Sequence, residues 1–238
     1  MKNIITIAKK ELATFFNSLS AYIILIVFLG LTGFFTWLYG SDVFIRKQAD
    51  LIVFFNIAKW TLFFFIPAIT MKLISEEKNT GTLELLLTKP VTDTQVVLGK
   101  FLAAFMLVVI ALAFTLIYFI TITYLGDADK GAIISGYAGL LLFSAAYISI
   151  GLFASSLTKN QIVAFLLALT IGIFFQLIFD ILANSFTGGI ANLFGFLSLS
   201  GHFDSMARGV WDSRDIIYFI SICILGIELA KENLAFRK

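Results

Sequence analysis

Residues 71–100, MKLISEEKNTGTLELLLTKPVTDTQVVLGK, decide how this chain folds. They form a charged island between two apolar runs, and each run is long enough for a membrane-crossing helix of ~20 residues. Because charged side chains avoid the hydrocarbon core, we expect the island at one face of a membrane. A short structured element between two membrane helices is suited to passing on the movement of a soluble partner.

The composition indicates an all-α polytopic membrane protein. Hydrophobic residues make up 60% of the 238-residue chain, charged residues make up 13%, and the mean hydropathy is +0.98. A soluble domain needs far more polar surface. The apolar runs are continuous rather than alternating, which argues against a β-barrel.

The chain lacks the motifs of an enzyme or a metalloprotein. Its single cysteine, Cys223, rules out a disulfide framework and a cysteine-based metal site. No GxxxxGK[ST] phosphate-binding loop occurs, so we expect no ATP hydrolysis by this chain and no cofactor of its own. We also predict no nucleic-acid partner.

We predict one domain, residues 1–238, with six membrane spans. The spans cover residues 19–39, 57–74, 95–125, 132–155, 161–182 and 215–233. The first is too long for the core of a signal peptide, so we interpret it as a retained helix. Pro67 is expected to kink the second span. The third exceeds the length that a span needs and is expected to tilt or to project from the membrane.

Signals for helix starts precede three of these spans. Thr92 with Gln95, and Thr158 with Gln161, fit the capping box before the third and fifth spans. Asp212 is a plausible N-cap of the sixth span.

Two segments outside the spans are predicted to lie at the membrane surface. Residues 1–18 hold a basic amphipathic helix, over 1–17, of the kind that lies in the interface; a plain extension of the first span is the alternative. Residues 183–214 are mildly apolar, and Gly188, Gly189 and Gly195 are expected to break them into short re-entrant or interfacial helices. This outer segment could shape the exit of a pathway, although capping of the bundle is the default interpretation.

The basic residues set the predicted orientation. With the N-terminus inside, 11 lysines and arginines fall on the inner side and 6 on the outer side. This bias places both termini and the island in the cytoplasm.

Residues 75–92 are the predicted cytosolic coupling segment, helical over 77–91. One face carries residues at helical spacing, namely Leu83, Leu86, Leu87 and Pro90, and the other carries Glu77, Gly81, Glu84 and Thr88. Such an element can dock into a groove of a soluble protein. An interfacial hairpin that only connects two spans is equally compatible with this periodicity.

A motif in the island favours the docking interpretation. It reads EE-x(3)-GT-x-E-x-LL-x(2)-P…GK and consists of Glu76, Glu77, Gly81, Thr82, Glu84, Leu86, Leu87, Pro90, Gly99 and Lys100. It resembles the signature of ABC-2 type permeases, the membrane subunits of many ABC exporters. The resemblance implies a coupling helix that contacts a nucleotide-binding subunit, and it implies a coupling role for the motif residues from Glu76 to Pro90.

A second motif, GHFDSMARGVWDSRD at residues 201–215, resembles a stretch before the last span in one branch of these permeases. That branch includes the gliding-motility and nitrous-oxide-reductase maturation types, and the SLSAYIIL…GLTGFFTWL wording is most similar to the gliding-motility permease of Bacteroidetes. The resemblance implies a bacterial inner-membrane protein. Its implied partners are a cytosolic ATPase that binds ATP and Mg, a second permease copy, identical or related, and an auxiliary membrane protein with an extracytoplasmic domain.

Four further residues are candidates for a pathway or an outer gate. Gln176 and Asp180 lie one turn apart on one face of the fifth span, near its end. His202, the only histidine, lacks metal-binding neighbours, so a structural role beside Phe203 is favoured.

The fourth span is rich in small residues, which predict close helix packing. They are Gly136, Gly139, Ser144, Ala145, Ala146, Ser149 and Gly151.

Together these features predict the permease subunit of an ATP-driven ABC transporter, an exporter by resemblance. One alternative is a secondary transporter or channel without an ATPase, but the span centres carry almost no charge, which counts against it. The other is a structural subunit of a membrane machine that moves no substrate, which the gliding-motility resemblance keeps open.

Overall fold

The computed structural model describes residues 2–39, 43–46, 48–82 and 91–235, and these residues form helices and connecting turns without a β-strand. The helices are α1 (Lys2–Asn17), α2 (Leu19–Trp37), α3 (Val43–Arg46), α4 (Ile52–Thr80), α6 (Asp93–Leu125), α7 (Lys130–Leu157), α8 (Gln161–Ile173), the π-helix η1 (Phe174–Ile178), α9 (Phe179–Ser185), α10 (Gly189–Leu197), α11 (Leu199–Ala207) and α12 (Ser213–Ala235).

Five helical stretches in the described part of the chain are long and apolar enough to cross a membrane. They are α2, α4, α6, α7 and the continuous run Gln161–Ser185. The prediction of an all-α polytopic membrane protein is thus confirmed. Residues 215–233 lie in α12, but this helix is not among the five; it carries charged residues near both ends, including Asp215 and Lys231. The sixth span therefore stays a prediction.

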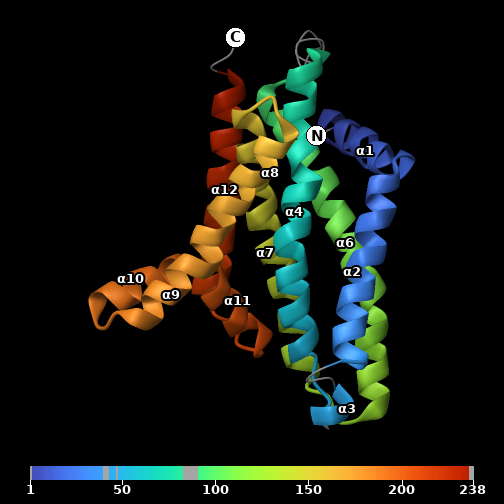
Figure 1. The fold of residues 1–238 in the computed structure, drawn as a ribbon, viewed down its shortest axis with the longest axis vertical. Helices are drawn as coiled ribbons and strands as arrows, with labels where there is room; N and C mark the ends of the chain where they lie inside the picture. Colours follow the sequence, from blue (N-terminus) through green and yellow to red (C-terminus); the bar gives the residue numbers. More distant parts are fainter. Residues whose placement is uncertain (1, 40–42, 47, 83–90, 236–238) are drawn as a thin grey trace.

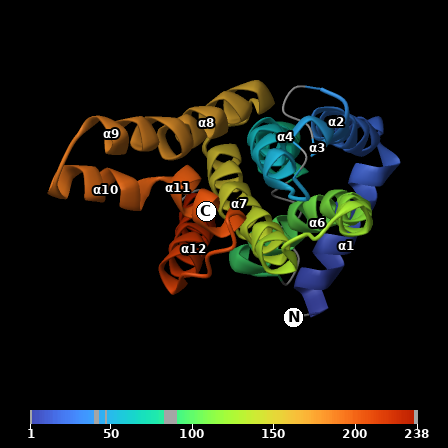
Figure 2. The same ribbon diagram turned by 90° about the horizontal axis from the view of Figure 1, so that it is seen from below.

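The long helices form one bundle around α7. In Figures 1 and 2, α4 and α7 lie between α2 and α6 on one side and α8 and α12 on the other. The helix α1, the last turn of α4 and the last turns of α12 lie at the same end of the bundle (Figure 1), which we call the island end. A hairpin of α9 and α10 projects sideways from the bundle.

Small residues let α7 occupy the centre. A Cβ atom on Gly136 would collide with the ring of Phe55 on α4, and one on Gly151 would collide with Thr70 of the same helix. Because glycine has no side chain, the two helices can approach this closely. The close packing that the sequence predicted for the fourth span is confirmed.

Two of the three predicted helix starts are confirmed and one is wrong. Before α6, the Gln95 amide N–H donates to Thr92 Oγ1 (3.3 Å) and the Thr92 N–H donates to Gln95 Oε1 (3.4 Å), which completes the capping box. Asp212 Oδ1 accepts from the Arg214 N–H (2.9 Å) at the start of α12.

The predicted capping box before α8 is not formed, because Thr158 lies two residues too early. Asn160 is the N-cap instead, and its Oδ1 accepts from the N–H groups of Ile162 (2.9 Å) and Val163 (3.4 Å). Thr158 ends α7, and its hydroxyl accepts from the Asn160 N–H (3.1 Å).

The second predicted span is longer than expected, and the predicted helix over 77–91 is wrong at its start. The helix α4 continues through Pro67 to Thr80, so Glu77 belongs to it. Gly81 ends α4 in the left-handed conformation, with φ of 71°, which glycine adopts at little cost. Residues 83–90 of the predicted coupling segment lie outside the described residues.

The breaks in the outer segment agree with the sequence only in part. Gly188, with φ of 73°, separates α9 from α10 as expected. Gly195, in contrast, lies inside α10. The next break comes at Ser198, whose hydroxyl accepts from the Gly201 N–H (3.1 Å) and so caps α11. A side-chain cap at Ser198, and not Gly195, thus sets this boundary.

Candidate functional site

A buried lysine joins three helices at the island end. Lys100 of α6 has a side chain that is 1% exposed. Its Nζ lies 2.9 Å from Glu77 Oε1 on α4 and 3.4 Å from Glu11 Oε1 on α1. A buried charge requires partners of opposite sign. The lysine therefore holds both α1 and α4 against α6.

The residue before this lysine lets α1 come close. A Cβ atom on Gly99 would lie 2.6 Å from Ile7 Cγ2 and 3.2 Å from the carbonyl oxygen of Ile4. One turn earlier, Asn3 Nδ2 donates to Gln95 Oε1 (3.2 Å). Gly99 and Lys100 of the motif thus form the surface against which α1 packs.

The residue after Glu77 ties α4 to the other side of the bundle. Lys78 Nζ donates to the carbonyl oxygen of Ser156, near the end of α7. Asn233 of α12 donates to the same oxygen and to Ser156 Oγ (3.0 Å). The neighbouring Ser155 hydroxyl accepts from the Ser75 N–H (3.1 Å). Glu77 of α4 therefore contacts α6 directly, and Lys78 contacts α7 directly. Through Lys100 and Ser156, these contacts extend to α1 and α12.

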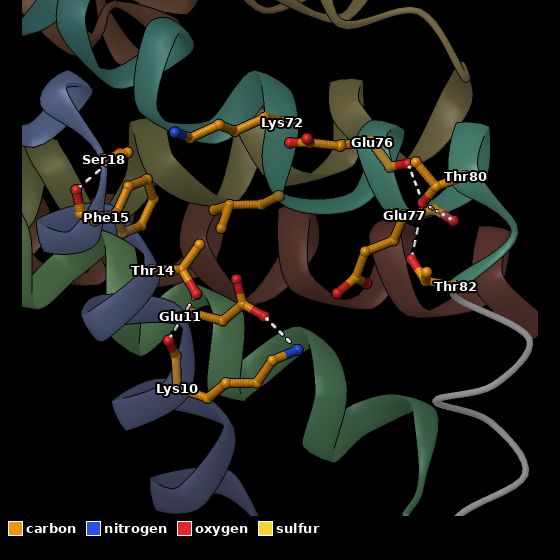
Figure 3. Close-up of a pocket in the computed structure, with 11 residues that line it drawn as sticks. Lys10, Glu11, Thr14, Phe15, Ser18, Lys72, Glu76, Glu77, Thr80 and Thr82 are labelled. Carbon is orange, nitrogen blue, oxygen red and sulfur yellow. Dashed lines mark hydrogen bonds and ion pairs between the residues drawn. The ribbon is translucent and has the colours of Figure 1, made fainter.

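A cavity of about 450 Å³ opens between α1 and α4 at this end (Figure 3). Residues from both helices, from the junction of α1 and α2, and from the turn after α4 line it, namely Lys10, Glu11, Thr14, Phe15, Ser18, Lys72, Leu73, Glu76, Glu77, Thr80 and Thr82. Lys72 Nζ donates to Ser20 Oγ (2.9 Å) and lies 5.1 Å from the centre of the Phe15 ring. The Oε2 atom of Glu77 is buried and accepts no hydrogen bond from the described residues.

The structure brings part of the predicted coupling set together. Glu76, Glu77 and Thr82 line the cavity, and Gly81 ends α4 beside it. The remaining members, Glu84, Leu86, Leu87 and Pro90, lie outside the described residues. Besides Glu77, this end is joined to the bundle by residues that the sequence did not assign to the site: Glu11, Lys78, Lys100, Ser156 and Asn233.

A helical spacing could have revealed Glu11. It shares a face of α1 with Ile4, Ile7 and Phe15, and the last two are buried. An acidic residue on the packed face of a helix needs a cation nearby, and Lys100 is that cation.

The two predicted pathway residues of the fifth span differ in burial. Gln176 is 2% exposed and its Nε2 donates to no acceptor in the described part of the chain. Asp180 is only partly buried. Between them the backbone is a π-helix, in which the Phe179 N–H donates to the carbonyl oxygen of Phe174, five residues earlier. The wider turn changes the alignment that the sequence spacing assumed.

His202 and Phe203 are integral to the packing of α11. His202 Nδ1 lies 2.6 Å from Asp215 Oδ1 on α12, and Nε2 lies 3.0 Å from the carbonyl oxygen of Phe196 on α10. The imidazole stacks on Tyr218, with ring centres 4.1 Å apart. Phe203 is fully buried. No cluster of three or more potential metal ligands occurs among the described residues.

A second ion pair links α11 to α4. Lys59 Nζ lies 2.7 Å from Asp204 Oδ1, donates to Ser200 Oγ (3.0 Å), and lies 5.4 Å from the centre of the Phe203 ring. Nothing in the sequence identifies Asp204 as the partner of Lys59. The general rule that a charge inside an apolar helix is paired predicts that a partner exists, but not which one.

The fold and this site define a multi-pass helical membrane protein in which buried polar residues link the helices. Residues 5–194 match the model of a family described as ABC-2 family transporter protein, so the chain belongs to the ABC-2 transporter family and is a membrane permease of an ABC transporter. Membership implies that a separate cytosolic ABC ATPase works with it. The match ends before α11 and α12. No curated protein matched the sequence.

Proposed function

We propose that this permease is part of an exporter, and that the segment from Glu76 to Pro90 receives the movement of the cytosolic ATPase. The island end then faces the cytoplasm. Closure of the ATPase dimer on binding ATP displaces the segment beyond Gly81. The displacement passes through α4 into the bundle and shifts the balance between inward-facing and outward-facing states.

The arrangement around Glu77 and Lys78 carries this proposal. These two residues precede the end of α4 by less than one turn. Glu77 contacts Lys100 of α6, and Lys78 contacts Ser156 of α7. Because both contacts are buried, we expect a displacement of the end of α4 to pass to α6 and α7.

Two sequence features support a more specific proposal. The second motif resembles the branch that includes the gliding-motility permeases, and the SLSAYIIL…GLTGFFTWL wording is most similar to those permeases. Both favour a role in that machinery, with a second permease copy and an auxiliary extracytoplasmic protein as partners. In the structure, the described residues of the second motif link α11 to its neighbours, as the pair of His202 and Asp215 illustrates.

The proposal is tested by purifying the tagged chain in mild detergent, identifying the proteins that co-purify, and measuring their ATPase activity. We expect an ABC ATPase to co-purify. Gly81→Trp and Glu84→Lys should reduce the stimulated ATPase activity while membrane insertion stays normal. Gly30→Trp, at a site with open space around it, and Glu232→Lys, on the exposed surface of α12, are the matched controls.

The possible results separate the competing functions. Full ATPase activity in both coupling variants contradicts the coupling role. A chain that purifies without any ATPase favours a secondary transporter or channel. An ATPase that binds and hydrolyses ATP without any transported substrate favours the structural subunit.

A further inference from the structure

We propose that the cavity between α1 and α4 binds the headgroup of a zwitterionic aminophospholipid. The phosphate would lie beside Lys72, and the primary ammonium would lie beside Glu76 and Glu77. This inference does not depend on the coupling role of the island.

The position of the cavity suits a lipid headgroup. Phe15 and Leu73 give it an apolar wall. Ser18, on its rim, directly precedes α2, whose first turn exposes Leu19 (77%) and Tyr22 (49%). Exposed apolar side chains at the start of a membrane-crossing helix contact acyl chains, so the cavity lies near the level at which headgroups are found.

The charges around the cavity have both signs. Lys10 and Lys72 line it together with Glu11, Glu76 and Glu77, and Lys100 behind the wall is shared by two of these carboxylates. The local charge is therefore close to zero. An anionic headgroup alone would face Glu76, and a simple cation would face Lys72, whereas a headgroup that carries both charges meets neither repulsion.

The groups that could hold the phosphate and the ammonium lie toward opposite ends of the cavity. Figure 3 shows Lys72 and Ser18 toward one end and Glu77, Thr80 and Thr82 toward the other. The ammonium of Lys72 has three donors, of which Ser20 takes one. The buried Oε2 of Glu77 lacks a donor among the described residues. A buried carboxylate oxygen without a donor is costly, and a primary ammonium would supply one.

The same argument selects among zwitterionic lipids. A choline headgroup carries a quaternary ammonium, which has no N–H and cannot donate to Glu77. An ethanolamine headgroup carries a primary ammonium and can. We therefore expect phosphatidylethanolamine to bind in preference to phosphatidylcholine and to the anionic phosphatidylglycerol.

Native mass spectrometry of the full-length chain in detergent tests this inference. Each of the three lipids is added separately, and the fraction of protein that retains one lipid is measured against lipid concentration. Phosphatidylethanolamine should be retained at a concentration about tenfold lower than the others, the ratio expected when one charge-assisted hydrogen bond is lost. Glu76→Gln should abolish most of this preference, whereas Lys72→Met removes the partner of the phosphate that all three lipids carry and should weaken the retention of all three.

Matched controls keep the test decisive. Lys9→Met removes an exposed lysine of α1 that does not line the cavity, and it should keep the preference. If Lys72→Met fails to fold, Glu76→Gln still tests the site, because Glu76 is exposed. Equal retention of all three lipids by the unmodified protein, or an equal loss in Lys9→Met, would overturn the inference.

A further arm identifies the source of the headgroup. Soluble O-phosphoethanolamine is added at millimolar concentration to the complex with phosphatidylethanolamine. Failure to displace the lipid shows that the acyl chains contribute and that the membrane supplies the ligand. Displacement shows that the cavity recognises the same phosphate and ammonium chemistry from solution.

Discussion

The island end and the α11 region hold their buried charges in different ways. At the island end, Lys100 is shared by two carboxylates from two other helices. In the α11 region, Lys59 with Asp204 and His202 with Asp215 form separate one-to-one pairs. A shared lysine stays paired when one partner leaves, whereas a one-to-one pair leaves an unpaired charge. We therefore expect the island end to tolerate rearrangement and the α11 region to resist it.

The acidic partners in the two regions also differ in how far their side chains are exposed. The side chains of Glu11 and Glu77 are 12% and 16% exposed, so neither can turn freely into water. Asp204 is 43% exposed and can. Loss of Lys100 should thus lower the free energy of unfolding more than loss of Lys59. Loss of a single carboxylate at the island end should have a small effect, because the other carboxylate still pairs with Lys100.

The largest effect is expected for Lys100→Met. This change leaves two largely buried carboxylates close together without a cation, and removal of one member of a buried ionic group costs about 3–5 kcal/mol. The free energy of unfolding, measured by titration with a denaturing detergent, should fall by that amount. Lys9→Met, at an exposed position on α1, should change it by less than about 0.5 kcal/mol. A similar loss in both variants would contradict the assignment of Lys100 as the central charge.

His202→Leu should follow, with a loss of about 1.5–3 kcal/mol, the range for a hydrogen bond to a charged group. The change leaves Asp215 buried, with its Oδ1 unpaired beside an Oδ2 that accepts no hydrogen bond from the described residues. A double-mutant cycle sharpens the test. His202→Leu combined with Asp215→Leu should recover part of the loss, because replacing both partners by apolar groups removes the unpaired charge. Additive losses would show that the pair is not coupled.

The sequence predicted the positions of the apolar helices well, because their periodicity and length depend on the chain alone. The capping box of Thr92 and Gln95 is local and was found for the same reason. The end of α4 was missed, because the charged residues from Ser75 to Thr80 suggested a separate element. They continue the helix instead, since Glu and Lys favour helix and Lys78 is bound by α7.

The candidate site was predictable only in part, because its contacts join distant positions. Glu77 was assigned from the motif, but its partner Lys100 is 23 residues away and the second carboxylate, Glu11, is 66 residues away in the other direction. Periodicity places such residues on a helix face but does not say which face of another helix they meet. The partners of Lys59 and His202 were missed for the same reason.

Lys59→Met should have a smaller effect than either change above. Its partner Asp204 keeps access to water, and partly exposed ion pairs contribute little, so we expect a loss of about 1 kcal/mol. The measurement is again the free energy of unfolding, with Lys130→Met at an exposed position of α7 as the control. A loss equal to that of Lys100→Met would show that the two regions do not differ in the way that their exposures indicate.

The smallest global effect is expected for Glu11→Gln. The contact of 2.9 Å between Lys100 and Glu77 stays in place, so the free energy of unfolding should fall by less than about 1 kcal/mol. The local effect is larger, because α1 loses the 3.4 Å contact between Glu11 and the buried lysine and keeps its packing against Gly99 in this part of the described structure. Backbone amide hydrogen exchange in α1 should accelerate severalfold, while exchange in α12 stays unchanged.

The possible results distinguish three arrangements. Unchanged exchange in α1 would mean that packing against Gly99 alone holds this helix. Acceleration in both helices would mean that Lys100 stabilises the whole bundle as one unit. Acceleration confined to α1 would show that a helix can be released at the island end while the bundle stays intact, as a shared charge permits.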